Sequence, residues 1–284
     1  MIKVILFGNT GLANGVFRAL IENKNIEVCA VYTRKLPGHF PYYQEQELWY
    51  MSEQHGIPTF VGENVNSEKS VATISRFEPD YIIVSSFDQI VKNPVINIPK
   101  LGIVNFHPSL LPKYRGPNPI SWVLINGEEL TGLTIHKLTK GIDSGDILYQ
   151  KKLIVDKDDN LGKLYQKLSA LAESMSQVLV KDITSAELPD GMPQKEENMS
   201  YYAKSDTFRY VDINQSKENI LNKVKAFQPF PKPLLKIDDV DYSITNVIVH
   251  DVSTDKESGL STDLNTYYLK KDDFTIEFNI SAIS

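Results

Sequence analysis

The chain has 284 residues, of which 42% are hydrophobic and 23% are charged, as is ordinary for a globular protein. Its length fits one large domain and one small domain. The single cysteine, Cys29, excludes an internal disulfide and a zinc site built from several cysteines. No apolar run approaches the roughly 20 residues of a membrane helix, and a net charge of −6 means that any nucleic-acid binding would need a local basic patch. We therefore expect a cytoplasmic protein without a membrane segment or a metal.

The first residues predict a β-α-β unit. Residues 2–7 form a short apolar run that ends at Gly8, as expected for a buried strand with no signal peptide before it. Residues 12–21 then carry one apolar stripe at helical spacing, and residues 26–32 form a second apolar run. Such an opening implies a parallel sheet.

Helix and strand patterns continue to alternate along the first half of the chain. Helices are predicted over 44–55 and 67–77, and strands over 58–61, 81–85 and 101–106. The alternation predicts an α/β fold with a doubly wound, mostly parallel sheet, which binds ligands at the carboxyl ends of its strands. Gly8, Ser85 and His107 all lie at such ends, as one shared crevice requires.

The second half of the chain predicts a change of architecture near residue 200. Two further strands are predicted over 130–138 and 147–155, then a helix from Asp159 and a loop over 182–200. Residues 1–200 then form the catalytic domain, and residues 201–284 form a smaller β-rich accessory domain. In the accessory domain we predict a helix over 216–227 and two strand-like runs with alternating apolar residues at Tyr242, Ile244, Phe274, Ile276, Phe278 and Ile280.

Three polar residues suit acyl transfer. Asn105 and His107 lie two apart at the end of the predicted strand 101–106, so both side chains leave the same face of the sheet. Asp143 sits in a turn flanked by glycines, residues 141–145, where a carboxylate can be aimed at a nearby imidazole. An amide that holds an oxyanion, an imidazole that titrates near neutral pH and a carboxylate that orients it form a proton-transfer and charge-stabilising set.

The stretch from Asn105 to Ile147 resembles the folate-dependent formyltransferase family, and the resemblance extends over residues 1–200. The matching residues are Asn105, His107, Ser109, Leu110, Leu111, Pro112, Tyr114, Arg115, Gly116, Pro119, Gly132, Thr134, His136, Asp143, Gly145, Asp146 and Ile147. The resemblance implies that Asn105, His107 and Asp143 are catalytic and that 10-formyltetrahydrofolate is the co-substrate. His136 lies inside a predicted strand, and for this residue a structural role is favoured.

The loop after the first predicted strand is a candidate substrate contact. Asn9, Thr10 and Gly11 lie where backbone N–H groups at a helix start could hold a phosphate. The loop lacks a complete G-x-G-x-x-G pattern and the lysine of a Walker motif, so a dinucleotide site is not expected. The alternative is an ordinary strand-to-helix turn.

Two other segments carry candidate ligand contacts. The resemblance places Phe87, Asp88 and Ile90 beside the pterin, and the alternative is an exposed loop with one packed aromatic ring. Arg115 either holds a phosphate or clamps its own loop through backbone carbonyls.

The resemblance implies transfer of the formyl group from 10-formyltetrahydrofolate to a primary amine, and charge and domain organisation bear on which amine accepts it. A methionyl-tRNA enzyme should carry a basic insertion and a basic second domain. Residues 33–47 hold two basic and two acidic side chains, and residues 201–284 hold ten Lys or Arg against thirteen Asp or Glu, a net charge of −3. A purine-pathway transformylase would normally lack a second domain. Elimination and the resemblance together favour a dTDP- or UDP-linked amino-dideoxy sugar, whose base could stack on Tyr201, Tyr202, Phe227 or Phe230, although packing roles are expected for most of these rings.

Three alternatives stay open. Methionyl-tRNA formylation would make tRNA the acceptor. Formyltetrahydrofolate hydrolysis would need no acceptor, but such hydrolases usually begin with a regulatory domain, and this chain begins with the first strand. A binding protein without turnover would not need the set of Asn105, His107 and Asp143. We expect a small nucleotide-sugar partner and no nucleic acid, and the resemblance to sugar formyltransferases is compatible with a homodimer.

Overall fold

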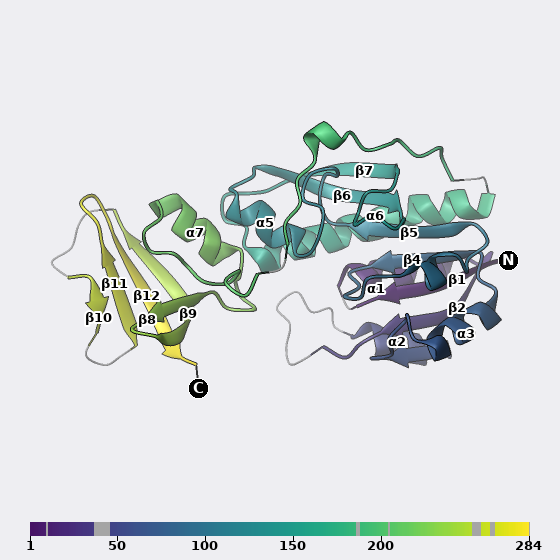
Figure 1. Ribbon diagram of the computed structural model, residues 1–284, viewed down its shortest axis with the longest axis horizontal. Helices are drawn as coiled ribbons and strands as arrows, with labels where there is room; N and C mark the ends of the chain where they lie inside the picture. The colour runs from purple at the N-terminus through teal and green to yellow at the C-terminus, as the bar shows by residue number, and fades with distance from the viewer. Residues whose placement is uncertain are drawn as a thin grey trace.

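The computed structural model contains two β-sheets that form neighbouring domains along the longest axis of the molecule (Figure 1). The residues described are 1–9, 11–36, 46–185, 188–203, 205–251, 257–261 and 265–283. Within these ranges, no helix has both the length and the apolar character that crossing a bilayer would require.

The large sheet has seven strands in the order β3-β2-β1-β4-β5-β6-β7. They are β1 (Ile2–Gly8), β2 (Ile26–Thr33), β3 (Thr59–Val61), β4 (Tyr81–Ser85), β5 (Gly102–His107), β6 (Leu130–Lys137) and β7 (Ile147–Ile154). The first five are parallel, and β6 and β7 are antiparallel to their neighbours. The predicted doubly wound, mostly parallel sheet is therefore confirmed. Its order reverses between β1 and β4, where sheets of this kind bind ligands.

Helices cover both faces of the large sheet. One face packs on α1 (Leu12–Glu22), α2 (Leu48–Gln54), α5 (Pro119–Ile125) and α6 (Leu161–Ser185), and the other on α3 (Glu68–Phe77) and α4 (Asn93–Ile96). Strand β1 shows why both faces must be covered. Val4 and Leu6 enter the first core while Ile5 and Phe7 enter the second, as the two-residue period of a strand dictates.

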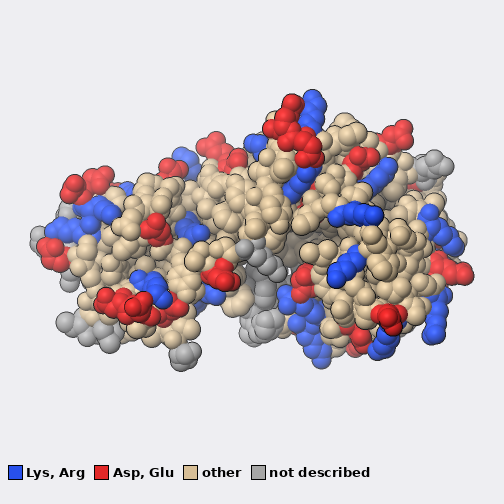
Figure 2. Space-filling view, viewed as in Figure 1, with Lys and Arg blue, Asp and Glu red and all other residues tan. Residues whose placement is uncertain are grey.

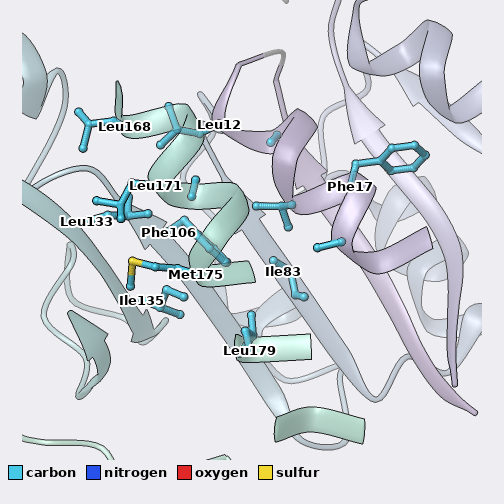
Figure 3. Packing of buried hydrophobic residues seen from close by; sticks show 14 of the residues in the cluster. Leu12, Phe17, Ile83, Phe106, Leu133, Ile135, Leu168, Leu171, Met175 and Leu179 are labelled. Atoms are coloured by element: carbon cyan, nitrogen blue, oxygen red, sulfur yellow. The ribbon is translucent and has the colours of Figure 1, made fainter. Parts of the chain in front are cut away.

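Helix α6 is the main support of the first core. Its residues Leu168, Leu171, Met175 and Leu179 lie over the sheet beside α1 (Figure 3). The helix predicted from Asp159 is thus confirmed. It continues to Ser185, so the loop predicted over 182–200 begins too early, because Ile183 is still buried in this core.

The second sheet is antiparallel, in the order β10-β11-β12-β9-β8. Its strands are β8 (Leu234–Ile237), β9 (Val240–His250), β10 (Gly259–Leu260), β11 (Thr266–Lys270) and β12 (Thr275–Ala282), and α7 (Lys217–Lys225) packs on it. Ile220 and Val224 of α7 meet Ile244, Ile276 and Phe278 in a separate core. The predicted smaller β-rich domain is therefore confirmed, while the exact boundary near residue 200 stays a prediction.

Between the two domains the chain returns across β6 and β7 (Figure 1). We call residues 192–201 the return segment; it includes the short helix η1 (Glu196–Asn198). Met192 exchanges two backbone hydrogen bonds with Ile147, at 2.8 and 2.9 Å, and the Arg115 backbone N–H donates to the Ser200 carbonyl at 2.9 Å. The return segment is therefore attached both to the first residue of β7 and to the loop that follows β5.

Candidate active site

The structure brings the three predicted catalytic residues together at the carboxyl end of β5. Asn105 and His107 lie on β5, and Asp143 lies in the turn between β6 and β7. Asn105 is paired with His136 of the antiparallel strand β6, which places those two side chains next to each other. His136 is therefore part of the cluster, a position that its favoured structural role did not predict.

The Asp143 carboxylate is the centre of this cluster. Its Oδ1 accepts a hydrogen bond from Asn105 Nδ2 at 3.3 Å and lies 3.6 Å from His136 Nε2. Its Oδ2 accepts a hydrogen bond from the Gly116 backbone N–H at 2.9 Å and lies 3.6 Å from His107 Nδ1. One carboxylate thus joins both imidazoles and the Asn105 amide.

The charge states follow from burial and from these neighbours. Burial lowers the pKa of His107, although the Asp143 charge opposes this effect, so the imidazole is neutral at pH 7. Burial alone would raise the pKa of Asp143, but His107, His136 and the Gly116 N–H together hold it well below its usual range. The cluster therefore contains an ionised carboxylate beside a neutral imidazole.

Hydrogen bonds also fix which nitrogen of His107 carries the proton. Its Nε2 lies 2.7 Å from the carbonyl oxygen of Tyr114, which can only accept, so Nε2–H is the donor. The unprotonated Nδ1 then lies on the Asp143 side. A proton taken up there would form an imidazolium next to a carboxylate, which is the arrangement that a general base requires.

The second imidazole is oriented in the same way. His136 Nδ1 lies 2.9 Å from the carbonyl oxygen of Lys137 and donates to it, which leaves Nε2 to accept from Asn105 Nδ2 at 3.1 Å. Both N–H groups of the Asn105 amide are thus engaged, one by His136 and one by Asp143. Donation to an oxyanion would replace one of these two bonds.

A second group of predicted residues lies where the strand order reverses. Asn9 is buried, and its Nδ2 donates to Asp88 Oδ1 at 3.3 Å, while Asp88 Oδ2 pairs with Arg34 at 3.0 Å. Phe87 packs on the Phe7 ring, with 5.4 Å between centroids, whereas Ile90 is largely exposed.

Thr10 and Gly11 follow Asn9 in the chain, between β1 and α1. Gly11 adopts a φ of 105°, and an added Cβ would lie 2.4 Å from the Tyr165 hydroxyl, so only glycine fits there. Thr10 lies outside the described residues.

Three buried polar atoms at this edge have no hydrogen-bond partner among the described residues. They are Asn9 Oδ1, Ser85 Oγ and Thr33 Oγ1, at or just beyond the carboxyl ends of β1, β4 and β2. Buried polar groups are rarely left unpaired. The three atoms therefore make this end of the sheet a candidate site for a polar ligand.

Arg115 is held inside the protein. Its guanidinium donates to Gln194 Oε1 at 2.8 and 3.0 Å, and to the Glu196 carboxylate at 2.9 and 3.2 Å. These bonds fit the clamp interpretation, although the acceptors are side chains of the return segment and not backbone carbonyls. A phosphate contact of Arg115 stays a prediction, and it would have to displace these bonds.

The four aromatic candidates differ in accessibility. Tyr202 stacks on Trp122, and Phe227 is buried. Tyr201 and Phe230 are 48% and 38% exposed. The Tyr201 ring lies against Gly116, where an added Cβ would come within 2.7 Å of it. Tyr201 is therefore an accessible ring beside the loop between β5 and α5, residues 108–118, which we call the catalytic loop.

Two findings come from comparing the sequence with known proteins. A family model described as formyl transferase matches residues 2–181. Methionyl-tRNA formyltransferase of Ehrlichia ruminantium (strain Gardel) is 31% identical over 229 residues, which cover 80% of this chain and 74% of that protein.

Two solved structures share the fold over nearly the whole chain. WlaRD, a sugar 3N-formyl transferase in the presence of dTDP and 5-N-formyl-THF, aligns with a TM-score of 0.70 and 20% identity, covering 99% of this chain and 98% of that one. The N-formyltransferase from Helicobacter canadensis, in complex with folinic acid and dTDP-3-aminofucose, aligns with a TM-score of 0.69 and 19% identity, covering 99% and 100%. Folate ligands in both agree with the predicted co-substrate.

Proposed function

The chain belongs to the formyl transferase family, and from that premise we propose that it moves a formyl group from 10-formyltetrahydrofolate to the amine of a nucleotide-linked amino-dideoxy sugar, with dTDP or UDP as the nucleotide. The observation that carries the proposed reaction is the pairing of a neutral His107 with an ionised Asp143 at 3.6 Å. Acyl transfer to an amine needs a proton acceptor, since the amine must lose a proton as the new bond forms, and a neutral imidazole beside a carboxylate can serve as one.

The proposed reaction has two steps. The amine nitrogen attacks the formyl carbon of the donor, a tetrahedral adduct forms, and His107 Nδ1 takes one proton from the nitrogen. The bond between the formyl carbon and the folate nitrogen then breaks, and the same proton passes to the leaving nitrogen. Asp143 stabilises the imidazolium between these steps, because its carboxylate lies beside Nδ1.

Asn105 donates a hydrogen bond to the oxygen of the tetrahedral adduct. As negative charge develops on that oxygen, Asn105 Nδ2 exchanges its bond to His136 or Asp143 for one to the oxyanion. Donors of this type are strongest where charge appears only in the transition state.

The donor is assigned to the edge where the strand order reverses. Ser85 Oγ and Thr33 Oγ1, which have no partner among the described residues, suit a heterocycle with several polar atoms. Phe87 beside them supplies an aromatic surface on the same edge. These residues, with Asp88 and the more exposed Ile90, would hold the folate.

The sugar acceptor is supported by length and charge. The two aligned sugar N-formyltransferase structures match this chain over 99% of its length, and both contain a dTDP moiety. Tyr201 offers an accessible ring for the base beside the catalytic loop. Asn9, Gly11 and Arg115 remain candidate contacts for the rest of the substrate, and so does Thr10.

Methionyl-tRNA is the second candidate acceptor, because relatives at 31% identity carry that name. Binding of tRNA requires basic surface that neutralises phosphates. Residues 201–284 carry a net charge of −3. On the face drawn in Figure 2, acidic and basic side chains are interspersed over both domains. These charges favour the nucleotide sugar.

Formyl transfer by the full chain tests the proposal. 10-Formyltetrahydrofolate would be supplied with dTDP-, UDP- and GDP-linked amino sugars, with methionyl-tRNA, or with no acceptor, and products would be measured by mass spectrometry. We expect an N-formyl product from a dTDP- or UDP-linked sugar. Product from methionyl-tRNA alone would show that tRNA is the acceptor and not the sugar. Turnover without any acceptor would indicate a hydrolase.

A further inference from the structure

Both the nitrogen and the oxygen of the Gln194 side-chain amide, in the return segment, make hydrogen bonds. Its Nε2 donates to the carbonyl oxygens of Asp143 and Gly145, each at 2.8 Å. Its Oε1 accepts two hydrogen bonds from Arg115. The orientation of the amide is unambiguous, since a guanidinium can only donate and carbonyl oxygens can only accept.

The turn that Gln194 holds is one that needs support. Asp143 has a φ of 47°, in the left-handed region that a residue other than glycine rarely adopts. Conformations of this kind persist where the surroundings fix them, often at functional sites. The two carbonyls that Gln194 binds lie at residues 143 and 145, so its amide spans the part of the turn that aims the carboxylate.

These contacts form a closed ring around the catalytic carboxylate. Asp143 Oδ2 accepts from the Gly116 N–H, Gly116 follows Arg115 in the chain, and the Arg115 side chain binds Gln194. Gln194 then returns to the Asp143 carbonyl. The ring thus links the backbone carbonyl of Asp143 to its own carboxylate through Gln194, Arg115 and Gly116.

The ring uses a part of the chain beyond the residues that the family model matches. The family model ends at residue 181, whereas Gln194 belongs to the connection toward the second sheet. Gln194 is only partly exposed and touches none of the three catalytic side chains through its own hydrogen bonds. Its contribution to chemistry must therefore pass through the Asp143 backbone, or through Arg115 and the Gly116 N–H that binds the Asp143 carboxylate.

We propose that Gln194 is a positioning residue that sets the direction of the Asp143 carboxylate toward His107. This inference rests on the proposed function for its kinetic consequence. A purely structural role would instead confine the effect of Gln194 to the stability of the fold. The two roles are separable, because only a positioning role depends on Asp143 being present.

The first test replaces Gln194 with methionine, which keeps the length and removes every hydrogen bond. For the full chain we expect Gln194→Met to lower kcat by about 10- to 100-fold with little change in KM, since a misplacement of about 1 Å can cost about 10² in rate. In an Asp143→Ala background, the same substitution should change kcat no further. A further loss of similar size in that background would overturn the proposal.

Gln194→Glu separates the two sides of the amide. Glutamate keeps an acceptor for Arg115 but turns a carboxylate toward two carbonyl oxygens. A loss of kcat at least as large as in Gln194→Met is expected, whereas wild-type kcat would show that the bonds to the two carbonyl oxygens do not position Asp143 and would contradict the proposal. The matched control is Gln177→Met, since Gln177 is exposed on α6 and makes one bond, to Glu22 at 3.3 Å. This control should behave as wild type.

A readout without substrate keeps this inference distinct from the proposed function. The pKa of His107 can be followed by NMR titration of the imidazole in each variant. Because the Asp143 charge raises that pKa, Gln194→Met should lower it and Gln177→Met should not. An unchanged pKa in Gln194→Met contradicts the proposal, even if the wild type formylates none of the acceptors supplied.

Discussion

The carboxyl end of the large sheet has two neighbouring regions where ligands are expected, and these regions differ in how completely their polar atoms are paired. Around Asp143, every carboxylate oxygen has a hydrogen-bond donor, and Gln194 fixes the turn from behind. Where the strand order reverses, Ser85 Oγ and Thr33 Oγ1 have no partner among the described residues. The first region, around Asp143, is ordered before substrate arrives, as catalysis by fixed dipoles requires. The second offers polar atoms that a ligand can satisfy.

Replacing His107 should have the largest effect. His107→Ala removes the proposed general base, so we expect kcat/KM to fall by about 10²- to 10⁴-fold. Initial rates of formyl transfer measure this loss, and the thermal melting curve checks that the variant is folded. Turnover close to that of the wild type would remove His107 from the mechanism.

Replacing Asn105 should cost somewhat less. Asn105→Ala removes the oxyanion donor but leaves His107 and Asp143, and the loss of one such donor typically costs about 10²- to 10³-fold in kcat. The same rate assay measures it. If only KM rises, Asn105 binds substrate in the ground state and does not stabilise the adduct.

The pH profile sharpens the charge assignment. Burial lowers the pKa of His107, so the base stays neutral as pH falls to the ordinary histidine value of about 6.5, and activity is lost below it. Asp143→Asn removes the charge that raises this pKa, so the acid limb should move to lower pH while the plateau drops.

Titration of the acceptor amine is common to wild type and Asp143→Asn and cancels in the ratio of the two kcat/KM profiles. A shift of the acid limb to higher pH in Asp143→Asn would contradict the proposed contact between the two side chains.

The smallest effect is expected in the second region, where the strand order reverses. Ser85→Ala removes a buried hydroxyl that has no partner among the described residues, so stability should be unchanged or slightly raised, while KM for the folate should increase. Ser109→Ala is the matched contrast, because the Ser109 hydroxyl donates to the Lys113 carbonyl at 2.7 Å and its loss should cost about 1 kcal/mol.

Urea unfolding of the two serine variants measures the difference in stability. Equal destabilisation by both substitutions would mean that Ser85 Oγ is hydrogen-bonded in the free protein. The difference in polar pairing between the two regions would then be lost.

Much of the fold could be predicted from local patterns. The apolar runs of β1, β2, β4 and β5 are short and bounded, and the predicted α/β sheet and family are confirmed. Helix α5 has a weaker signal, because it follows Asn118 in a left-handed conformation without a side-chain cap.

The site was predictable only in part, for a reason of geometry. Asn105 and His107 share one strand, so their common face follows from the period of two. His136 joins them through the register of an antiparallel pair, which a single sequence does not fix. Gln194 lies 51 residues from Asp143 and 79 from Arg115. Contacts at such separations depend on the path of the return segment.

The most direct test of the account is a competition between its two acceptors. Full-length wild-type protein would receive formyl-labelled 10-formyltetrahydrofolate with a dTDP-linked amino sugar and methionyl-tRNA together, and label would be measured in each product at low and at physiological salt. The account predicts label in the sugar at both salt concentrations and none in the tRNA. Label that enters the tRNA, and falls steeply as salt rises, would contradict it.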